Sequence, residues 1–413
     1  MQTGIPALWI VMLAAVGMAW SSNERSVADD DLVKQIQDIG GTVLRDNNAA
    51  GHPIVEIHIE NYLNIGAKKD QEKVQRVVAK LAGLKKLHCL HLSGDGVTDA
   101  QLRLLNGLDD LRTLWLRDAT ITQQGINELS KLKNLETIDL FDTSLATVNL
   151  KAFSGLQKLK SINFSKTAIN DESLQSLGEL GELRDLDLSY TPITDEGLKR
   201  SDRFKNLRSL NLNQAKVTDQ GLKQLTSLKK LQSLVLERTL ITDESFQDII
   251  SLESLEELRL PGTKIKGLEL AKLVNLPKLR SLALGGIPLP DEAFPQLGKL
   301  KKLQQLALGN TGTTKLRLKQ LTPLTELESL DLWANPLTDE DLKELAGFSK
   351  LRSLSLSEMR ITDAGLQNLL PLKNLILLHI FHTHVTEEGV RRFQKDSPNT
   401  KIEWISPLPP LRP

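Results

Sequence analysis

One leucine frame repeats along most of this chain and restricts what it can fold into. From Leu87 to Leu375 there are 288 residues, which is twelve steps of 24, so the frame recurs without insertion or deletion. The thirteen starting positions are Leu87, Leu111, Leu135, Leu159, Leu183, Leu207, Leu231, Leu255, Leu279, Leu303, Leu327, Leu351 and Leu375. A fixed period of this length is typical of repeat architectures rather than of globular domains.

The stretch 183–207 shows what one unit contains. It opens with Leu-x-x-Leu-x-Leu, whose last two leucines point to one side of a strand because they are two residues apart. Ile193 then turns inward, Thr194 stands where a helix N-cap belongs, and Asp195 follows where the helix dipole favours negative charge. This pattern predicts a leucine-rich-repeat solenoid with one strand and one short helix per coil.

A single coil cannot bury leucines that lie on one side only, so stacked coils must share an apolar column. Parallel strands stand about 4.8 Å apart, whereas packed helices need roughly 8–10 Å. This difference bends the stack. We therefore expect an α/β solenoid, a horseshoe of about 13 regular repeats with a parallel sheet on the concave face and short helices on the convex face.

The chain divides into five segments by pattern. Residues 1–20 contain an uncharged apolar run (5–20) and are predicted to be a signal peptide or an N-terminal anchor. Residues 21–86 are predicted to form a cap with two helices, a pair of strands and an atypical first coil beginning at Ile54. The repeats then occupy 87–398, a closing strand that carries Trp404 occupies 399–405, and a proline-rich tail occupies 406–413.

Composition narrows the partners and the compartment. Lys and Arg together number 52, as do Asp and Glu, so no bulk charge favours nucleic acid or an acidic membrane. The single cysteine, Cys89, cannot form a disulfide within the chain. We expect an exported protein, periplasmic, secreted or on the cell surface, which meets a membrane only if the N-terminal segment is retained as an anchor.

The turn and helix start of most repeats carry a recognisable motif: TPITDEGL, AKVTDQGL, TLITDESF and MRITDAGL. This motif resembles bacterial, planctomycete-like leucine-rich-repeat proteins with a T-x-[IV]-T-D-x-G-L unit, and it is similar in repeat type to the repeats of F-box proteins and GALA effectors. The resemblance implies a recognition surface and no particular chemistry. Segments 143–150, 263–270 and 311–318 lack the Thr-Asp helix start, so we expect irregular structure there, and Ser201 replaces an inward leucine.

The frame also predicts which side chains the concave face presents. Two groups of aromatic and charged residues stand out, one near Trp115 and one near Trp333, because aromatic residues and Arg dominate binding hot spots. The structural alternative is that strands tolerate aromatics and that the last ones contact the caps. The predicted binding residues are His91, Trp115, Arg117, Asp139, Phe141, Asp187, Arg259, Asp331, Trp333, His379 and Phe381. Between the groups, Ala283, Gly285, Ala307 and Gly309 predict a smooth floor.

Other chemistry finds little support in the sequence. His379, His382 and His384 suggest a metal site, but on a strand edge they need not converge. Cys89 lies two residues before His91, which is compatible with a nucleophile and base, although no third group is evident. No nucleophile elbow, metalloprotease helix or phosphate-binding loop is present. We predict no cofactor, no metal and no enzymatic activity. The tail matches an SH3-ligand pattern, which chance also explains.

The sequence thus favours a non-enzymatic, monomeric scaffold that recognises a protein partner on its concave face. Two alternatives remain open at this point. One is a substrate-recognition adaptor of the F-box-like ubiquitin-ligase type, and the other is a protein that binds carbohydrate or a cell surface.

Overall fold

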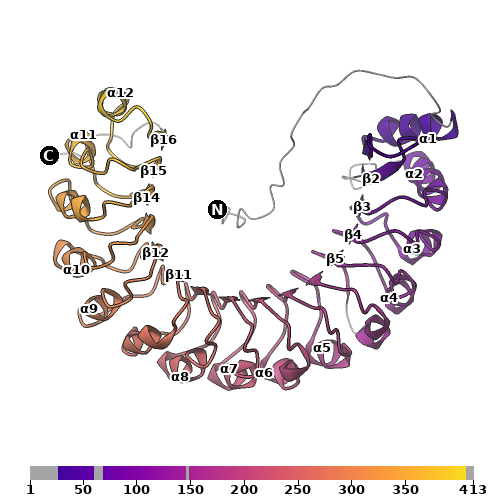
Figure 1. The fold of residues 1–413 in the computed structure, drawn as a ribbon, viewed down its shortest axis with the longest axis horizontal. Helices are drawn as coiled ribbons and strands as arrows, with labels where there is room; N and C mark the ends of the chain where they lie inside the picture. Colours follow the sequence, from indigo (N-terminus) through magenta and orange to yellow (C-terminus); the bar gives the residue numbers. More distant parts are fainter. Residues whose placement is uncertain (1–26, 60–67, 146–147, 406–413) are drawn as a thin grey trace.

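The computed structural model describes residues 27–59, 68–145 and 148–405, so the predictions for segments 1–20 and 406–413 lie outside the described residues. The described chain forms a curved solenoid whose sixteen strands make one open sheet, in chain order, along the inner wall (Figure 1). The predicted α/β leucine-rich-repeat horseshoe is confirmed. The strands are β1 (Thr42–Arg45), β2 (Ile54–Ile59), β3 (Cys89–Leu92), β4 (Thr113–Trp115), β5 (Thr137–Asp139), β6 (Ser161–Asn163), β7 (Asp185–Asp187), β8 (Ser209–Asn211), β9 (Ser233–Val235), β10 (Glu257–Arg259), β11 (Ser281–Ala283), β12 (Gln305–Ala307), β13 (Ser329–Asp331), β14 (Ser353–Ser355), β15 (Leu377–His379) and β16 (Lys401–Glu403).

Short helices line the outer wall, as Figure 1 shows. The α-helices are α1 (Val27–Asp38), α2 (Lys68–Leu81), α3 (Asp99–Leu104), α4 (Gln123–Leu129), α5 (Asp171–Ser176), α6 (Asp195–Leu198), α7 (Asp219–Leu225), α8 (Phe246–Ile249), α9 (Ala293–Leu297), α10 (Lys315–Gln320), α11 (Asp363–Gln367) and α12 (Glu387–Asp396). The 3₁₀ helices are η2 (Leu150–Gly155), η3 (Ser201–Arg203), η4 (Asp243–Ser245), η5 (Leu270–Asn275) and η6 (Asp341–Gly347). Among the described residues, no helix is both long enough and apolar enough to cross a bilayer.

The N-terminal part closes the open end of the leucine column. β1 pairs antiparallel with β2, and β2 pairs parallel with β3, so the stretch beginning at Ile54 is the first coil. Ile54, Ile57 and Ile59 are buried against the first regular repeat. At the other end β16 pairs parallel with β15, and Trp404 packs against the core.

The Asp and Thr of the motif join several pairs of neighbouring coils. Asp195 begins α6, and its two carboxylate oxygens accept hydrogen bonds from the Thr218 backbone N–H (2.8 Å) and hydroxyl (2.6 Å) in the following coil. Thr218 in turn accepts from Gln220 N–H as the N-cap of α7. The same Asp-to-Thr bridge links Asp99 to Thr122, Asp171 to Thr194, Asp219 to Thr242, Asp339 to Thr362 and Asp363 to Thr386.

The glycine of the motif makes room for that bridge. A Cβ on Gly221 would lie 2.4 Å from the Oδ1 atom of Asp195, closer than real side chains approach. An Asp that bridges to the Thr of the following coil therefore requires a small residue 26 positions later, on that neighbouring coil. The pairs that share this close approach are Asp99 with Gly125, Asp171 with Gly197, Asp195 with Gly221, Asp339 with Gly365 and Asp363 with Gly389.

In two of the three segments that lack the Thr-Asp start, the described residues form no α-helix, as predicted. They lead into the 3₁₀ helices η2 and η5. The prediction for 311–318 is wrong, because α10 is a regular helix from Lys315. Thr314 has the extended backbone of an N-cap, with φ −104°, and the Leu318 side chain is fully buried, so the inward apolar position suffices without an acidic residue.

The helix is interrupted where Ser201 replaces an inward leucine. α6 ends at Leu198 and is followed by η3, which contains Ser201 and Arg203. The Arg203 guanidinium is buried and donates to the carbonyl oxygens of Leu174 (2.6 Å) and Gln175 (3.1 Å). Burial lowers the pKa of this guanidinium to about 10.

Candidate functional site on the concave face

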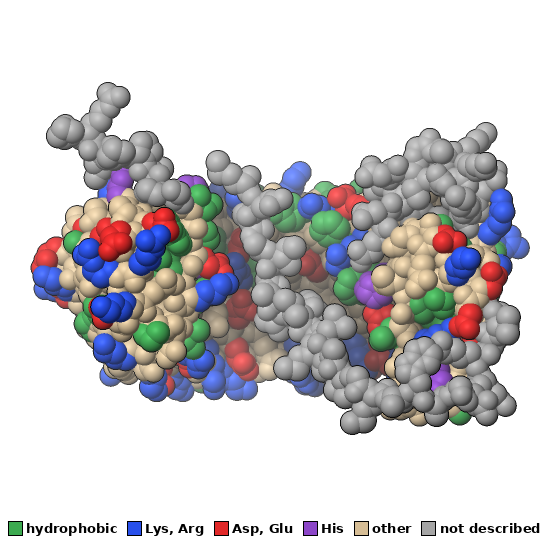
Figure 2. Space-filling model, turned by 90° about the horizontal axis from the view of Figure 1, so that it is seen from above, with side chains coloured by type: hydrophobic (Ala, Val, Ile, Leu, Met, Phe, Trp, Pro, Cys, Tyr) green, Lys and Arg blue, Asp and Glu red, His purple; other side chains and the backbone are tan. Residues whose placement is uncertain are grey.

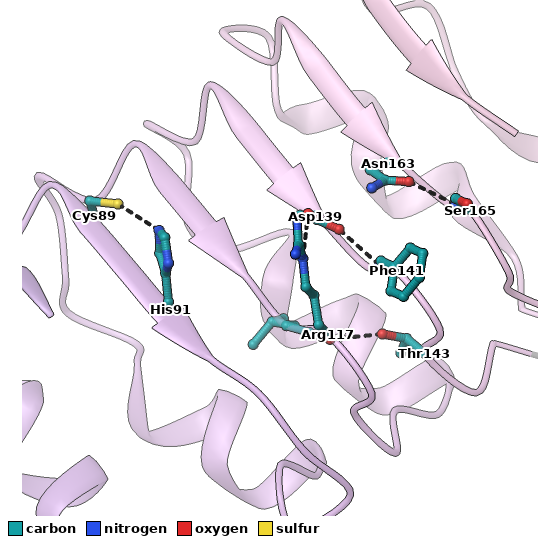
Figure 3. Close-up of polar contacts among 9 residues, drawn as sticks. Cys89, His91, Arg117, Asp139, Phe141, Thr143, Asn163 and Ser165 are labelled. Atoms are coloured by element: carbon teal, nitrogen blue, oxygen red, sulfur yellow. Dashed lines mark hydrogen bonds and ion pairs between the residues drawn. The ribbon is translucent and has the colours of Figure 1, made fainter. Parts of the chain in front are cut away.

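Three consecutive strands, β3 to β5, bring the first predicted group together, and Figure 3 shows His91, Arg117, Asp139 and Phe141 of this group. The His91 imidazole stacks on the Trp115 indole, with ring centroids 4.0 Å apart and planes 12° from parallel. The Arg117 guanidinium lies 4.6 Å from the Trp115 ring centroid and 5.8 Å from that of Phe141. Its Nε and Nη2 atoms donate to Asp139 Oδ2 at 2.9 and 2.8 Å. We call these five residues the N-terminal concave patch.

The ion pair in this patch positions Arg117 more than it stabilises the fold. Asp139 is buried, whereas the Arg117 side chain is 43% exposed, so water screens the pair and its net contribution is about 1 kcal/mol or less. Asp139 Oδ1 also accepts from the Phe141 backbone N–H at 2.9 Å. A guanidinium held by a buried carboxylate and stacked on indole presents a rigid cationic, aromatic surface to a ligand.

The structure adds residues that the sequence interpretation did not include. His58 on β2 lies beside His91, with ring centroids 3.8 Å apart, and the Glu56 carboxylate contacts the His58 imidazole. Cys89 Sγ lies 3.3 Å from His91 Nε2. The spacing Glu-x-His on one strand and Cys-x-His on the next would have signalled this cluster if the atypical coil had been aligned with the regular ones.

The Cys89 and His91 pair lacks the features of an activated nucleophile. Burial raises the pKa of the Cys89 thiol to about 12, and the Glu56 carboxylate adds to this shift. Burial lowers the pKa of His91 to about 4, with smaller effects from the charges of His58 and Arg117. A reactive cysteine needs a lowered thiol pKa, so both groups are neutral here and the pair does not favour covalent catalysis.

The Asp and Asn residues at the ends of several strands of the concave sheet have a structural role. Each side-chain oxygen accepts from the backbone N–H two residues later, as a local turn does. Asp139, Asp187 and Asp331, which were predicted to contact a ligand, make these local hydrogen bonds as well. The pairs are Asp139 with Phe141, Asn163 with Ser165, Asp187 with Ser189, Asn211 with Asn213 and Asp331 with Trp333.

In the middle of the sheet, the polar side chains are hydrogen-bonded to one another more fully than those of the N-terminal concave patch. Asp187 accepts hydrogen bonds from the Ser189 hydroxyl (2.6 Å) and from Asn211 Nδ2 (2.9 Å), and burial raises its pKa. Arg259 is bound by Glu237, with 2.6 Å between Nε and Oε1. These polar side chains are half-buried and could still donate or accept at their exposed edges.

The floor predicted between the two groups is not smooth. A Cβ on Gly309 would lie 1.8 Å from Trp333 Nε1, so the Trp333 indole occupies the space above that glycine. A Cβ on Gly285, one coil earlier, would meet only the Gly309 carbonyl oxygen, at 3.4 Å. The predicted floor is therefore partly covered by tryptophan, because Gly309 leaves room for the neighbouring ring. Burial raises the pKa of Asp331, two residues before Trp333.

The three C-terminal histidines do not converge. His379 Nε2 lies 3.3 Å from Glu403 Oε2 on the closing strand, and its ring faces Phe381 with centroids 6.0 Å apart. His382 has a left-handed backbone, with φ 54°, which turns the chain away from the strand. Within the described residues, the one group of three metal-ligating side chains whose ligand atoms come close is Glu56, His58 and His91.

The fold and this surface define the class of protein: a leucine-rich-repeat solenoid with an exposed concave sheet. Models of the leucine rich repeat match residues 133–193 and 205–225. No curated protein sequence matches the chain. Leucine-rich-repeat proteins are in general non-enzymatic scaffolds that bind other proteins.

Solved structures extend the likeness beyond those two segments. An internalin of Listeria monocytogenes is 21% identical, with a TM-score of 0.57, and the match covers 90% of this chain and 94% of that one. A leucine-rich-repeat protein of Leptospira interrogans is 22% identical, with a TM-score of 0.49, over 78% of this chain and 91% of that one. At 21% identity, the similarity to the internalin shows that the two proteins share a fold.

Proposed function

We propose that this protein is a non-enzymatic scaffold that binds a protein partner on its concave face, with the N-terminal concave patch as the main contact. This proposal rests on one observation. Trp115, Arg117 and Phe141 form a stacked surface on consecutive strands, the buried His91 ring stacks on Trp115, and Asp139 holds the Arg117 cation in place. Stacked aromatic and Arg side chains supply most of the energy at protein interfaces.

The patch is suited to binding because it is already ordered. Side chains that lose conformational freedom on binding cost roughly 0.5–1.5 kcal/mol each. Arg117 is restrained by two rings and a carboxylate, so little of that cost remains for it. Lys166 Nζ lies 4.7 Å from the Phe141 ring centroid and adds a second cation at the edge of the patch. A partner segment with a carboxylate next to an aromatic side chain would match this arrangement.

The remaining predicted residues would form a secondary contact surface along the same face. Asp187, Arg259 and Asp331 supply polar groups in the middle of the sheet, and Trp333, His379 and Phe381 supply rings near the C-terminal end. The charge of this protein does not indicate which class of macromolecule it binds. On the face that Figure 2 shows, Lys and Arg side chains lie among Asp and Glu, in keeping with 52 of each sign in the sequence.

We also infer that the protein is an exported bacterial protein and acts as a monomer. The apolar run 5–20 supports export, and the T-x-[IV]-T-D-x-G-L motif supports a bacterial source. The described part of residues 21–86 packs onto the first regular coil as a cap, which is consistent with a scaffold.

The test is partner capture by a double variant, Trp115→Ala with Arg117→Ala. The full chain would be used as bait, with proximity labelling in the source organism to name the partner and a binding titration to measure it. We expect at least a tenfold loss of affinity, since two hot-spot residues are removed. A matched control, Arg184→Ala with Tyr190→Ala, removes an exposed Arg and an exposed aromatic outside the patch. Equal affinity of the patch and control variants would refute the proposal.

A further inference from the structure

Two neighbouring strands place four metal-ligating side chains on the same face of the sheet. β2 and β3 pair in parallel, with Glu56 opposite Cys89 and His58 opposite His91. Residues two apart on one strand point the same way, so all four side chains rise from the concave face. The spacing is about 4.8 Å between strands and about 6.6 Å along them. We call Glu56, His58, Cys89 and His91 the β2–β3 cluster.

Three of the four ligand groups of the cluster lie close together. One ligand atom from each of Glu56, His58 and His91 lies within 4.8 Å of the others, and the Glu56 carboxylate contacts the His58 ring. Cys89 Sγ adjoins this group through His91 Nε2, at 3.3 Å. A tetrahedral zinc site with bonds of about 2.0–2.3 Å separates its ligand atoms by roughly 3.3–3.7 Å. The proposal therefore requires side-chain rotations that draw the three ligand groups together and bring Cys89 Sγ toward Glu56 and His58.

His91 provides a second, independent indication. Its side chain is only 6% exposed, and its Nδ1 atom is buried without a hydrogen-bond partner. A buried ring nitrogen without a partner is costly, and an ion bound through Nδ1 itself, rather than through the Nε2 atom beside Cys89, would remove that cost. Trp115 stacks on the His91 ring and restrains its plane. A purely structural role for His91 explains the stacking but not the unpaired nitrogen.

We propose that the β2–β3 cluster binds a zinc ion through Glu56, His58, Cys89 and His91. Nitrogen and sulfur ligands with one carboxylate suit zinc rather than magnesium or calcium. Four protein ligands make a closed site, so the ion would act as a structural clamp that ties the N-terminal cap to the first regular repeat. The Cys89 thiol would lose its proton to solvent when the ion binds, because the thiolate is the ligand.

The test uses the full chain, made without a polyhistidine tag, freed of metal with a chelator and titrated with Co²⁺ and then Zn²⁺. Cobalt bound by a thiolate at a tetrahedral site shows a sulfur-to-cobalt charge-transfer band and strong visible bands. We expect both bands, their loss on adding one equivalent of Zn²⁺, and a rise in thermal midpoint with zinc.

Variants separate this site from incidental metal binding. Cys89→Ser should abolish the charge-transfer band, and His91→Gln should weaken zinc binding at least tenfold. His379→Gln changes a half-buried histidine at the far end of the same sheet and should bind as the wild type does. Circular dichroism of each metal-free variant checks that it is folded. If no charge-transfer band appears, or if His91→Gln and His379→Gln bind zinc equally, the proposal is wrong.

Discussion

The bridge between Asp195 and Thr218 gives the most direct test of what holds neighbouring coils together. Asp195→Ala removes two hydrogen bonds and leaves the Thr218 backbone N–H without its acceptor. Hydrogen bonds to a charged group contribute about 1.5–3 kcal/mol each, and these are only partly buried. We therefore expect a loss of about 2–4 kcal/mol in the free energy of unfolding.

Gly221→Ala perturbs the same contact from the other side. The added methyl group would lie 2.4 Å from Asp195 Oδ1 and 2.7 Å from Val217 Cγ1, so the bridge or the helix must shift. Overpacking of this kind costs about 1–3 kcal/mol. Because both changes act on one carboxylate, their effects should not add, and the double variant should be less destabilised than the sum of the single ones.

Unfolding must be measured both globally and locally, because the coils of a repeat protein can open separately. Urea unfolding gives the overall loss, and amide hydrogen exchange shows whether protection falls first in α6 and α7. Glu196→Ala is the matched control. Its side chain pairs only with Lys199 on the exposed surface, so we expect a change within about 0.5 kcal/mol. If Asp195→Ala behaves like this control, or if the two effects add fully, the coil-to-coil explanation of the motif fails.

Two further predictions concern packing and pH. Gly309→Ala should displace the Trp333 indole, which increases acrylamide quenching of tryptophan fluorescence and costs about 1–3 kcal/mol, whereas Gly285→Ala should do neither. The hydrogen bond from Lys131 lowers the pKa of the Glu128 carboxyl, so its contribution is present above the ordinary pKa of 4.5 and is lost as pH falls through the lower folded value. Glu128→Gln should cost about 1 kcal/mol or less at pH 7, with a smaller difference at pH 3, measured by urea unfolding. Equal differences at both pH values would contradict the assigned cause.

Much of the fold follows from the sequence because it depends on a local period. The leucine spacing determines which side chains enter the core of each coil, and it predicted the solenoid with one strand per coil and its inward leucines. The prediction failed for 311–318, where an extended backbone at Thr314 and a buried Leu318 start a helix without an acidic residue. A helix start can thus rest on packing alone, which a motif search does not detect.

The candidate site was only partly predictable for a related reason. The frame identified His91, Trp115 and Phe141 as concave-face neighbours, since strands 24 residues apart lie side by side. It missed His58, because the first coil is separated from the repeats by an irregular interval of 33 residues between Ile54 and Leu87. It also assigned Asp139 to a ligand, although the carboxylate already serves the Phe141 backbone and Arg117.

The sequence by itself determined the period, the inward face of each coil and therefore the curved solenoid, because these depend on spacings within one repeat. Only the tertiary structure decided how atoms of different coils meet. It showed that the motif Asp bonds to the threonine of the following coil, that the motif glycine lies beneath that Asp, and that Trp333 covers Gly309. These contacts join residues 23 to 26 positions apart, and their geometry depends on the stacking distance and side-chain rotations, which no single repeat contains.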